Sequence, residues 1–166
     1  NIISIFKGIN VEVIIIANFK ALSDKYGKYF KNRYHLINIP SHDKGPLYSL
    51  FLAHKKIEKI VKNNKIFISY SDISWIWKIK EIINRIKNKN IVIFTHTGFH
   101  PHLKINKKSD FCKVKGNQIV NISEKKTFTK NYEKELLAIG CYYIKNFSYL
   151  KQYFLNNNNF NIKKEF

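Results

Sequence analysis

Two polar segments, each at the end of an apolar run, are the parts of this chain best suited to chemistry. Residues 65–72 (KIFISYSD) end on Asp72, and residues 118–125 (QIVNISEK) end on Glu124 and Lys125. A carboxylate at the end of a strand can hold a divalent cation, and a lysine there can neutralise a phosphate. Ligands of open α/β sheets bind at such strand ends. The two segments together predict a site for a metal-bound phosphorylated substrate.

Each of these segments also has a structural interpretation. Asp72 precedes a helix-period segment, so its carboxylate could accept backbone N–H bonds as an N-cap. Glu124 and Lys125 could be two solvated charges at the end of an edge strand. Because Lys126 follows directly, the sequence leaves open which lysine faces a ligand.

Two loops offer further candidates. Residues 41–46 (SHDKGP) lead into a helix, so their backbone N–H groups could bind an anion or the edge of a base, and an ordinary turn is the alternative. Residues 95–102 (THTGFHPH) contain three of the six histidines. His100 and His102 flank a proline and do not converge easily on one zinc ion with a third histidine. A loop that contacts substrate and a purely structural loop both remain open for this segment.

Gly140 interrupts the apolar run of residues 136–143 (LLAIGCYY). A glycine inside a strand weakens it and often marks a place where a ligand or another backbone comes close. A β-bulge is the equal alternative. Gly140 is therefore a candidate for a position at which a ligand approaches the sheet.

The elements that position these residues follow from hydrophobic periodicity. Short β-rich runs alternate with helix-period segments, which predicts an α/β domain with a mainly parallel central sheet covered by helices. Gly116 and Asn117 supply the two-residue turn of a hairpin. The predicted strands are residues 11–17, 34–39, 65–72, 90–95, 110–115, 118–123 and 136–144, and the predicted helices are residues 19–30, 47–62, 75–87 and 147–154.

Length and charge limit the class of protein. With 166 residues and 45% hydrophobic content, the chain suits one domain, which we place at residues 1–154 with a frayed tail at 155–166. The formal charge of +19 would normally indicate a nucleic-acid partner. Only two of the 30 basic residues are arginines, and the basic residues are spread along the whole chain. The sequence therefore predicts no specific nucleic-acid partner.

Cysteine and apolar content predict the compartment. The two cysteines have no CxxC spacing, and no apolar stretch approaches the length of a membrane span. We therefore expect a cytoplasmic protein without a membrane span. The sequence begins at Asn1 and contains no methionine, so we expect it to be a piece of a longer protein.

The order of the motifs resembles the central part of sugar-1-phosphate nucleotidyltransferases of bacterial capsule and surface-polysaccharide pathways. The resemblance covers about residues 1–154. It rests on five segments, namely residues 45–53 (GPLYSLFLA), 68–72 (ISYSD), 97–102 (TGFHPH), 123–129 (SEKKTFT) and 135–143 (ELLAIGCYY). It implies a three-layer Rossmann-like, GT-A-like nucleotidyltransferase fold that is incomplete at both ends. It also implies transfer of a nucleoside monophosphate from a nucleoside triphosphate to a sugar 1-phosphate, with release of pyrophosphate.

The same resemblance implies roles for particular residues. Asp72 would hold Mg²⁺ between the phosphates, and Gly45 would lie near the nucleobase. Glu124 would contact the sugar hydroxyls, and Lys125 would neutralise the sugar phosphate. Gly140 would let the sugar approach the backbone. Such a transfer depends on positioning and charge neutralisation more than on a nucleophile supplied by the protein.

The sequence also departs from the family. Ser71 stands where many members have glycine, and Lys126 stands where many have proline. The glycine-rich loop that cradles the triphosphate and the second metal-binding aspartate are missing from these 166 residues, so we expect this piece alone to be inactive. The alternatives from other classes are a GT-A-type glycosyltransferase, which would favour an acid where Ser74 stands, and a non-catalytic basic binding module.

Overall fold

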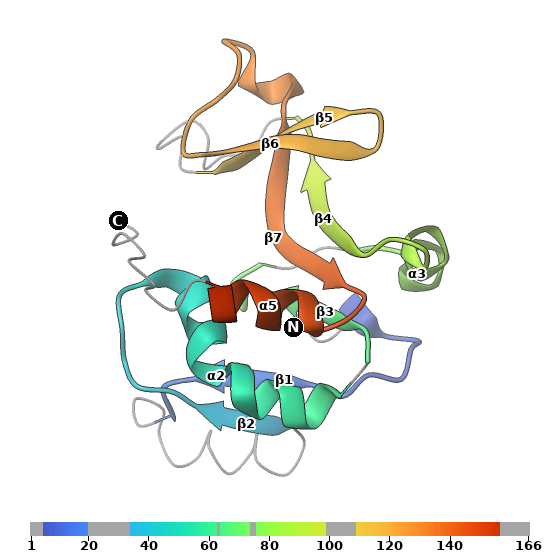
Figure 1. The fold of residues 1–166 in the computed structure, drawn as a ribbon. Helices are drawn as coiled ribbons and strands as arrows, with labels where there is room; N and C mark the ends of the chain where they lie inside the picture. Colours follow the sequence, from blue (N-terminus) through green and yellow to red (C-terminus); the bar gives the residue numbers. More distant parts are fainter. Residues whose placement is uncertain (1–4, 20–33, 63, 74–75, 99–108, 157–166) are drawn as a thin grey trace. The chain divides into compact units, whose positions relative to one another are not determined.

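The computed structural model describes residues 5–19, 34–62, 64–73, 76–98 and 109–156, and Figure 1 follows them along the chain. The described residues form both strands and helices, with α2, α3 and α5 interspersed among the strands, which confirms the predicted α/β class. The chain divides into two compact units. The first contains residues 1–66, 75–90 and 144–166, and the second contains residues 67–74 and 91–143.

The first unit contains a parallel pair of strands packed against a helix. β1 (Ile14–Ala17) pairs with β2 (His35–Asn38) residue by residue. The predicted runs are longer than these strands, because only four residues of each find a partner in register. α2 (Gly45–Val61) packs on the pair through an apolar cluster. The buried members of this cluster are Ile37, Ile39, Ala53, Ile57 and Phe147.

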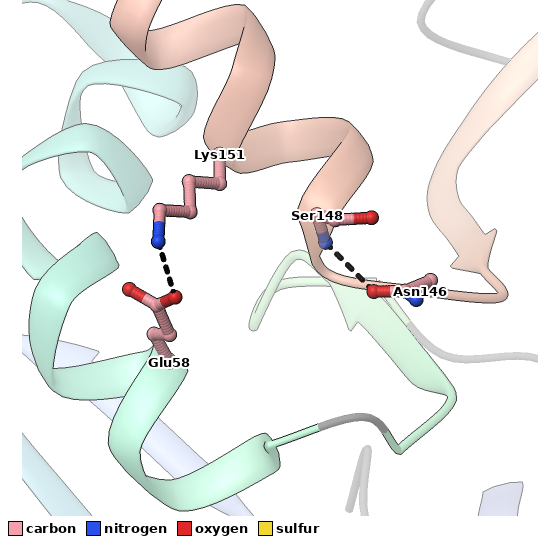
Figure 2. Close-up of polar contacts among 4 residues, drawn as sticks. All are labelled: Glu58, Asn146, Ser148 and Lys151. Atoms are coloured by element: carbon pink, nitrogen blue, oxygen red, sulfur yellow. Dashed lines mark hydrogen bonds and ion pairs between the residues drawn. The ribbon is translucent and has the colours of Figure 1, made fainter.

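α5 (Ser148–Asn156) confirms the predicted C-terminal helix and packs on α2. Its first turn is fixed by Asn146, whose Oδ1 accepts a hydrogen bond from the backbone N–H of Ser148 at 2.9 Å. One turn further on, Nζ of Lys151 lies 2.7 Å from Oε1 of Glu58 in α2 (Figure 2). Rings of the two helices also pack together: that of Phe154 in α5 lies against those of Phe51 and His54 in α2.

α3 (Ile79–Ile86) begins four residues later than the predicted start at residue 75. Nε1 of Trp77 donates a hydrogen bond to the backbone oxygen of Ile5 at 2.6 Å, so the residues before the helix serve a tertiary contact. Ile79 and Ile86 are both buried, and their spacing of seven residues places them on one face. The predicted helix at residues 19–30 falls almost entirely outside the described residues.

The second unit is a sheet centred on its longest strand, β7 (Leu136–Ile144). β3 (Ile66–Ser69) and β5 (Asp110–Lys115) pair with β7, and β6 (Gln118–Glu124) pairs with β5. β4 (Ile91–His96) also pairs with β7. Both pairings of β5, with β6 and with β7, are antiparallel.

The β5–β6 hairpin turns at Gly116 and Asn117, as predicted. Its base packs through Phe111 of β5, which is fully buried against Leu137 of β7 and Phe128. A short 3-10 helix, η3 (Tyr132–Lys134), precedes β7. Within the described ranges, every helix is too short or too polar to traverse a lipid bilayer.

Candidate functional site

Asp72 lies in the turn that directly follows β3, and its side chain is exposed. The N-cap interpretation is wrong, because α3 begins only at Ile79 and its N-cap residue is Lys78. No hydrogen bond or ion pair joins Asp72 to another residue that the structure describes. The carboxylate is therefore open to solvent and to a ligand.

Glu124 ends β6, and Lys125 follows with a strained backbone. Lys125 has a φ of +56°, a conformation that costs a residue with a side chain roughly 1–2 kcal/mol. Its backbone N–H donates to the oxygen of Ser109 at 3.1 Å, which holds the strained residue beside the start of β5. Nζ of Lys125 lies 3.1 Å from Oε1 of Glu124. The end of the strand thus fixes an ammonium group beside a carboxylate.

Asp110, the first residue of β5, lies directly opposite Glu124. A regular hairpin with this two-residue turn would place Ser123 there. A register shift between Lys113 and Val114 moves β6 by one residue and brings the second carboxylate opposite the first. Opposed residues of an antiparallel pair share a face of the sheet, with Cβ atoms roughly 5 Å apart.

The charges around Asp110 act on its pKa. Burial raises the pKa of the Asp110 carboxyl above its ordinary value, and the Glu124 carboxylate raises it further, whereas the Lys125 ammonium lowers it. Burial also raises the pKa of the neighbouring Cys112 thiol, and the Asp110 carboxylate adds to this effect. Two carboxylates and one ammonium therefore meet at this corner of a strongly basic protein.

Gly140 lies in β7 with a φ of +67°, and the space above its α-carbon is filled. A Cβ at this position would lie 2.6 Å from Cδ2 of Tyr70 and 3.0 Å from Cδ1 of Ile73. The backbone N–H of Tyr70 donates to the oxygen of Gly140 at 3.1 Å. Gly140 therefore permits other groups to come close to the backbone of β7. In this structure those groups are the side chains of Tyr70 and Ile73, which flank the turn that carries Asp72.

Tyr70 and Tyr142 connect this turn to the charged corner. Their ring centres lie 6.2 Å apart. Burial is the main cause that raises the pKa of the Tyr142 hydroxyl, followed by a hydrogen bond with the Tyr70 side chain and by the charge of Asp110. The two phenols have both donor and acceptor capacity, and the charge of the half-buried Asp110 acts on that of Tyr142.

Gly45 opens α2 and belongs to the first unit. Its φ of +76° favours glycine. The preceding loop is held by His42, whose Nδ1 accepts a hydrogen bond from the backbone N–H of Lys44 at 3.2 Å and whose Nε2 lies 3.0 Å from Oγ of Ser49. Nζ of Lys44 lies 4.7 Å from the centre of the Tyr48 ring. The loop is thus ordered by its own side chains at the start of the helix.

The other candidates from the sequence are histidines. His100 and His102 lie outside the described residues, so their roles stay predictions. Among the residues that are described, no three histidine, cysteine, aspartate or glutamate side chains come together as a metal site would require.

Comparison with known proteins adds evidence on the fold. No family model and no curated protein matches the sequence. Among solved structures, a match is a protein from Bacillus anthracis described as a glucose-1-phosphate thymidylyltransferase, in complex with a sucrose. The TM-score is 0.51 at 14% identity, over 84% of this chain and 58% of that one. The chain has the fold of that protein. The present chain spans little more than half of the length of that protein.

A second solved structure that matches is a UDP-glucose pyrophosphorylase complexed with UDP-glucose. The TM-score is 0.47 at 12% identity, and the match covers 76% of this chain and 49% of that one.

Three residues of the candidate site were not singled out as site residues from the sequence: Asp110, Tyr70 and Tyr142. Each of them belongs to a predicted strand. In the folded structure each lies close to a residue that the sequence did mark as a candidate. Strand pairing alone brings them together, and the signal that could have found Asp110 is its position as the first residue of a strand that leads into a hairpin.

Proposed function

We propose that this chain is part of a cytoplasmic nucleotidyltransferase that makes a nucleotide-sugar for surface-polysaccharide synthesis. An oxygen of the sugar 1-phosphate attacks the α-phosphorus of a nucleoside triphosphate. One P–O bond forms, the bond between the α- and β-phosphates breaks, and pyrophosphate leaves. The observation that carries the proposal is that Asp72, Glu124, Lys125 and Gly140 all belong to one compact unit.

The chain's own residues would bind and orient the sugar phosphate. Lys125, held at a strand end by its backbone bond to Ser109, would neutralise the phosphate. Glu124 would accept hydrogen bonds from sugar hydroxyls. Gly140 would allow the sugar close to β7, which requires the Tyr70 ring to move aside, because that ring occupies the space above the glycine. In the first unit, Gly45 would lie near the base.

The residues present fit a magnesium ion. Magnesium is usually bound through one or two carboxylates together with substrate phosphates and water, and Asp72 offers one exposed carboxylate after a strand. When bound, the ion would neutralise charge that develops on the phosphates. The role of the chain would be to hold the ion at the end of β3.

The intact protein tests the proposal when it is incubated with a panel of nucleoside triphosphates, glucose 1-phosphate and Mg²⁺. We expect pyrophosphate release that depends on both substrates and on magnesium. Asp72→Asn should abolish release while circular dichroism shows an unchanged fold, because the exposed side chain makes no contact with another described residue. Unchanged turnover in Asp72→Asn would remove this residue from the mechanism.

A further inference from the structure

The Asp110 carboxylate lacks a hydrogen-bond partner among the residues that the structure describes. It is half-buried, and a carboxylate that leaves water without gaining donors is costly. Glu124 opposite it can only accept hydrogen bonds when ionised. The Lys125 ammonium lies beside Glu124 and acts to lower the pKa of Asp110, but burial and the Glu124 carboxylate together outweigh it and the pKa is raised.

Asp110 shares a face of β5 with Cys112, which is buried. Side chains alternate along a strand, and the next residue, Phe111, packs into the apolar cluster with Leu137. Asp110 therefore lies on the other side of the sheet. On that side its charge helps to raise the pKa of the Tyr142 hydroxyl.

We propose that Asp110 is a specificity-determining residue of the sugar-phosphate site, where it and Glu124 accept hydrogen bonds from neighbouring hydroxyl groups of the sugar ring. This inference rests on the proposed function. Sugar hydroxyls supply the donor that the Asp110 carboxylate lacks among the described residues, and they can also bond to the Glu124 oxygen that Lys125 does not meet. A phosphate at the same place would meet two negative charges. The pair therefore directs the hydroxyl-bearing part of the ligand to Asp110 and leaves the phosphate to Lys125.

The test compares two probes, α-D-glucose 1-phosphate and inorganic phosphate, by isothermal titration calorimetry on the intact protein. Asp110→Asn keeps the size of the side chain but removes its charge and one acceptor oxygen. We expect it to lower the affinity for glucose 1-phosphate about tenfold or more, as for the loss of a hydrogen bond to a charged group. The affinity for inorganic phosphate should stay the same or rise, because one negative charge near Lys125 is removed.

The matched control is Glu133→Gln, which makes the same change of charge at an exposed position of the same unit. It should leave both affinities unchanged. Asp110→Ser is a second variant that also removes the charge, and it should lower the affinity for glucose 1-phosphate as well. Circular dichroism on each variant shows whether the fold is kept, which separates an effect on the site from an effect on folding. If the ratio of the two affinities is the same in Asp110→Asn as in the parent protein, the role of Asp110 is overturned. If the parent protein binds no glucose 1-phosphate, the proposed function itself fails.

Discussion

The ring of Tyr70 occupies the space that a side chain at Gly140 would need. A Cβ at residue 140 would lie 2.6 Å from Cδ2 of this ring and 3.0 Å from Cδ1 of Ile73. The contact joins β7 to the turn that carries Asp72, so the conformation of the turn depends on the absence of a side chain at residue 140.

Gly140→Ala should destabilise the protein for two reasons. The φ of +67° disfavours alanine by roughly 1–2 kcal/mol, and displacement of the Tyr70 ring adds about 1–3 kcal/mol as in other overpacked sites. Urea denaturation measures the free energy of unfolding. Gly116→Ala is the control, because Gly116 also has a positive φ, +58°, but nothing within 4 Å of the added Cβ. Equal losses in the two variants would contradict the packing argument.

Lys125→Ala should raise the KM for the sugar phosphate about tenfold or more, as expected when a charge-assisted hydrogen bond is lost. Alanine keeps the Cβ, so the strain at a φ of +56° is present in both proteins and stability should change little. Steady-state kinetics of the proposed reaction on the intact protein give the measurement. Lys126→Ala is the matched control with the same loss of charge. A larger effect at Lys126 would show that the neighbouring lysine meets the phosphate.

Glu135→Gln should weaken the second unit in a manner that depends on pH. The carboxylate accepts hydrogen bonds from the backbone N–H groups of Phe128 and Thr129, at 2.9 and 2.6 Å, and from Oγ1 of Thr129 at 2.7 Å. Burial acts to raise the pKa of Glu135, but these bonds together outweigh it and the pKa is lowered from 4.5. The stabilisation is therefore complete above pH 4.5 and is lost as the pH falls through the lower folded-state value.

The measurement is the free energy of unfolding of both proteins between pH 3 and 7 at one ionic strength. The variant should be less stable near neutral pH by roughly 1–3 kcal/mol, and the difference should shrink in acid. Glu133→Gln, at an exposed neighbouring position, controls for the loss of charge. A difference that is the same at all pH values would mean that the carboxylate is not the group responsible.

The ion pair between Glu58 and Lys151 should contribute little to stability, although its atoms lie 2.7 Å apart. Both side chains are about two-fifths exposed, and exposed pairs contribute roughly 0.2–1 kcal/mol. A double-mutant cycle with Glu58→Gln and Lys151→Gln should give a coupling energy in this range, reduced at high salt. The more exposed pair of Lys78 and Glu81 should give less, and a coupling of several kcal/mol at Glu58 would contradict this view.

Local signals in the sequence were sufficient for most of the elements. Gly116 and Asn117 predicted the hairpin, and the spacing of apolar residues predicted α2, because turn chemistry and helical periodicity act over a few residues. The start of α3 was predicted too early, since Trp77 bonds to Ile5, 72 residues away. A contact at that distance leaves no mark on local periodicity.

The candidate site was less accessible to sequence reasoning. Asp72, Glu124, Lys125 and Gly140 stand out by their type and their place in apolar runs. Asp110 does not, because its importance comes from the register shift that brings Glu124 opposite it. Sequence spacing cannot locate a shift of one residue, and such a shift changes which side chains share a face.

The division of the chain constrains how the protein can be dissected. The chain crosses between the two units at residues 66–67, 74–75, 90–91 and 143–144, so each unit is assembled from separate stretches of sequence. Truncation after residue 143 would leave the first unit without two buried side chains, Phe147 and Phe154 of α5. A version cut after residue 143 should therefore aggregate or be degraded, and removal of a unit would need an internal deletion with rejoined ends.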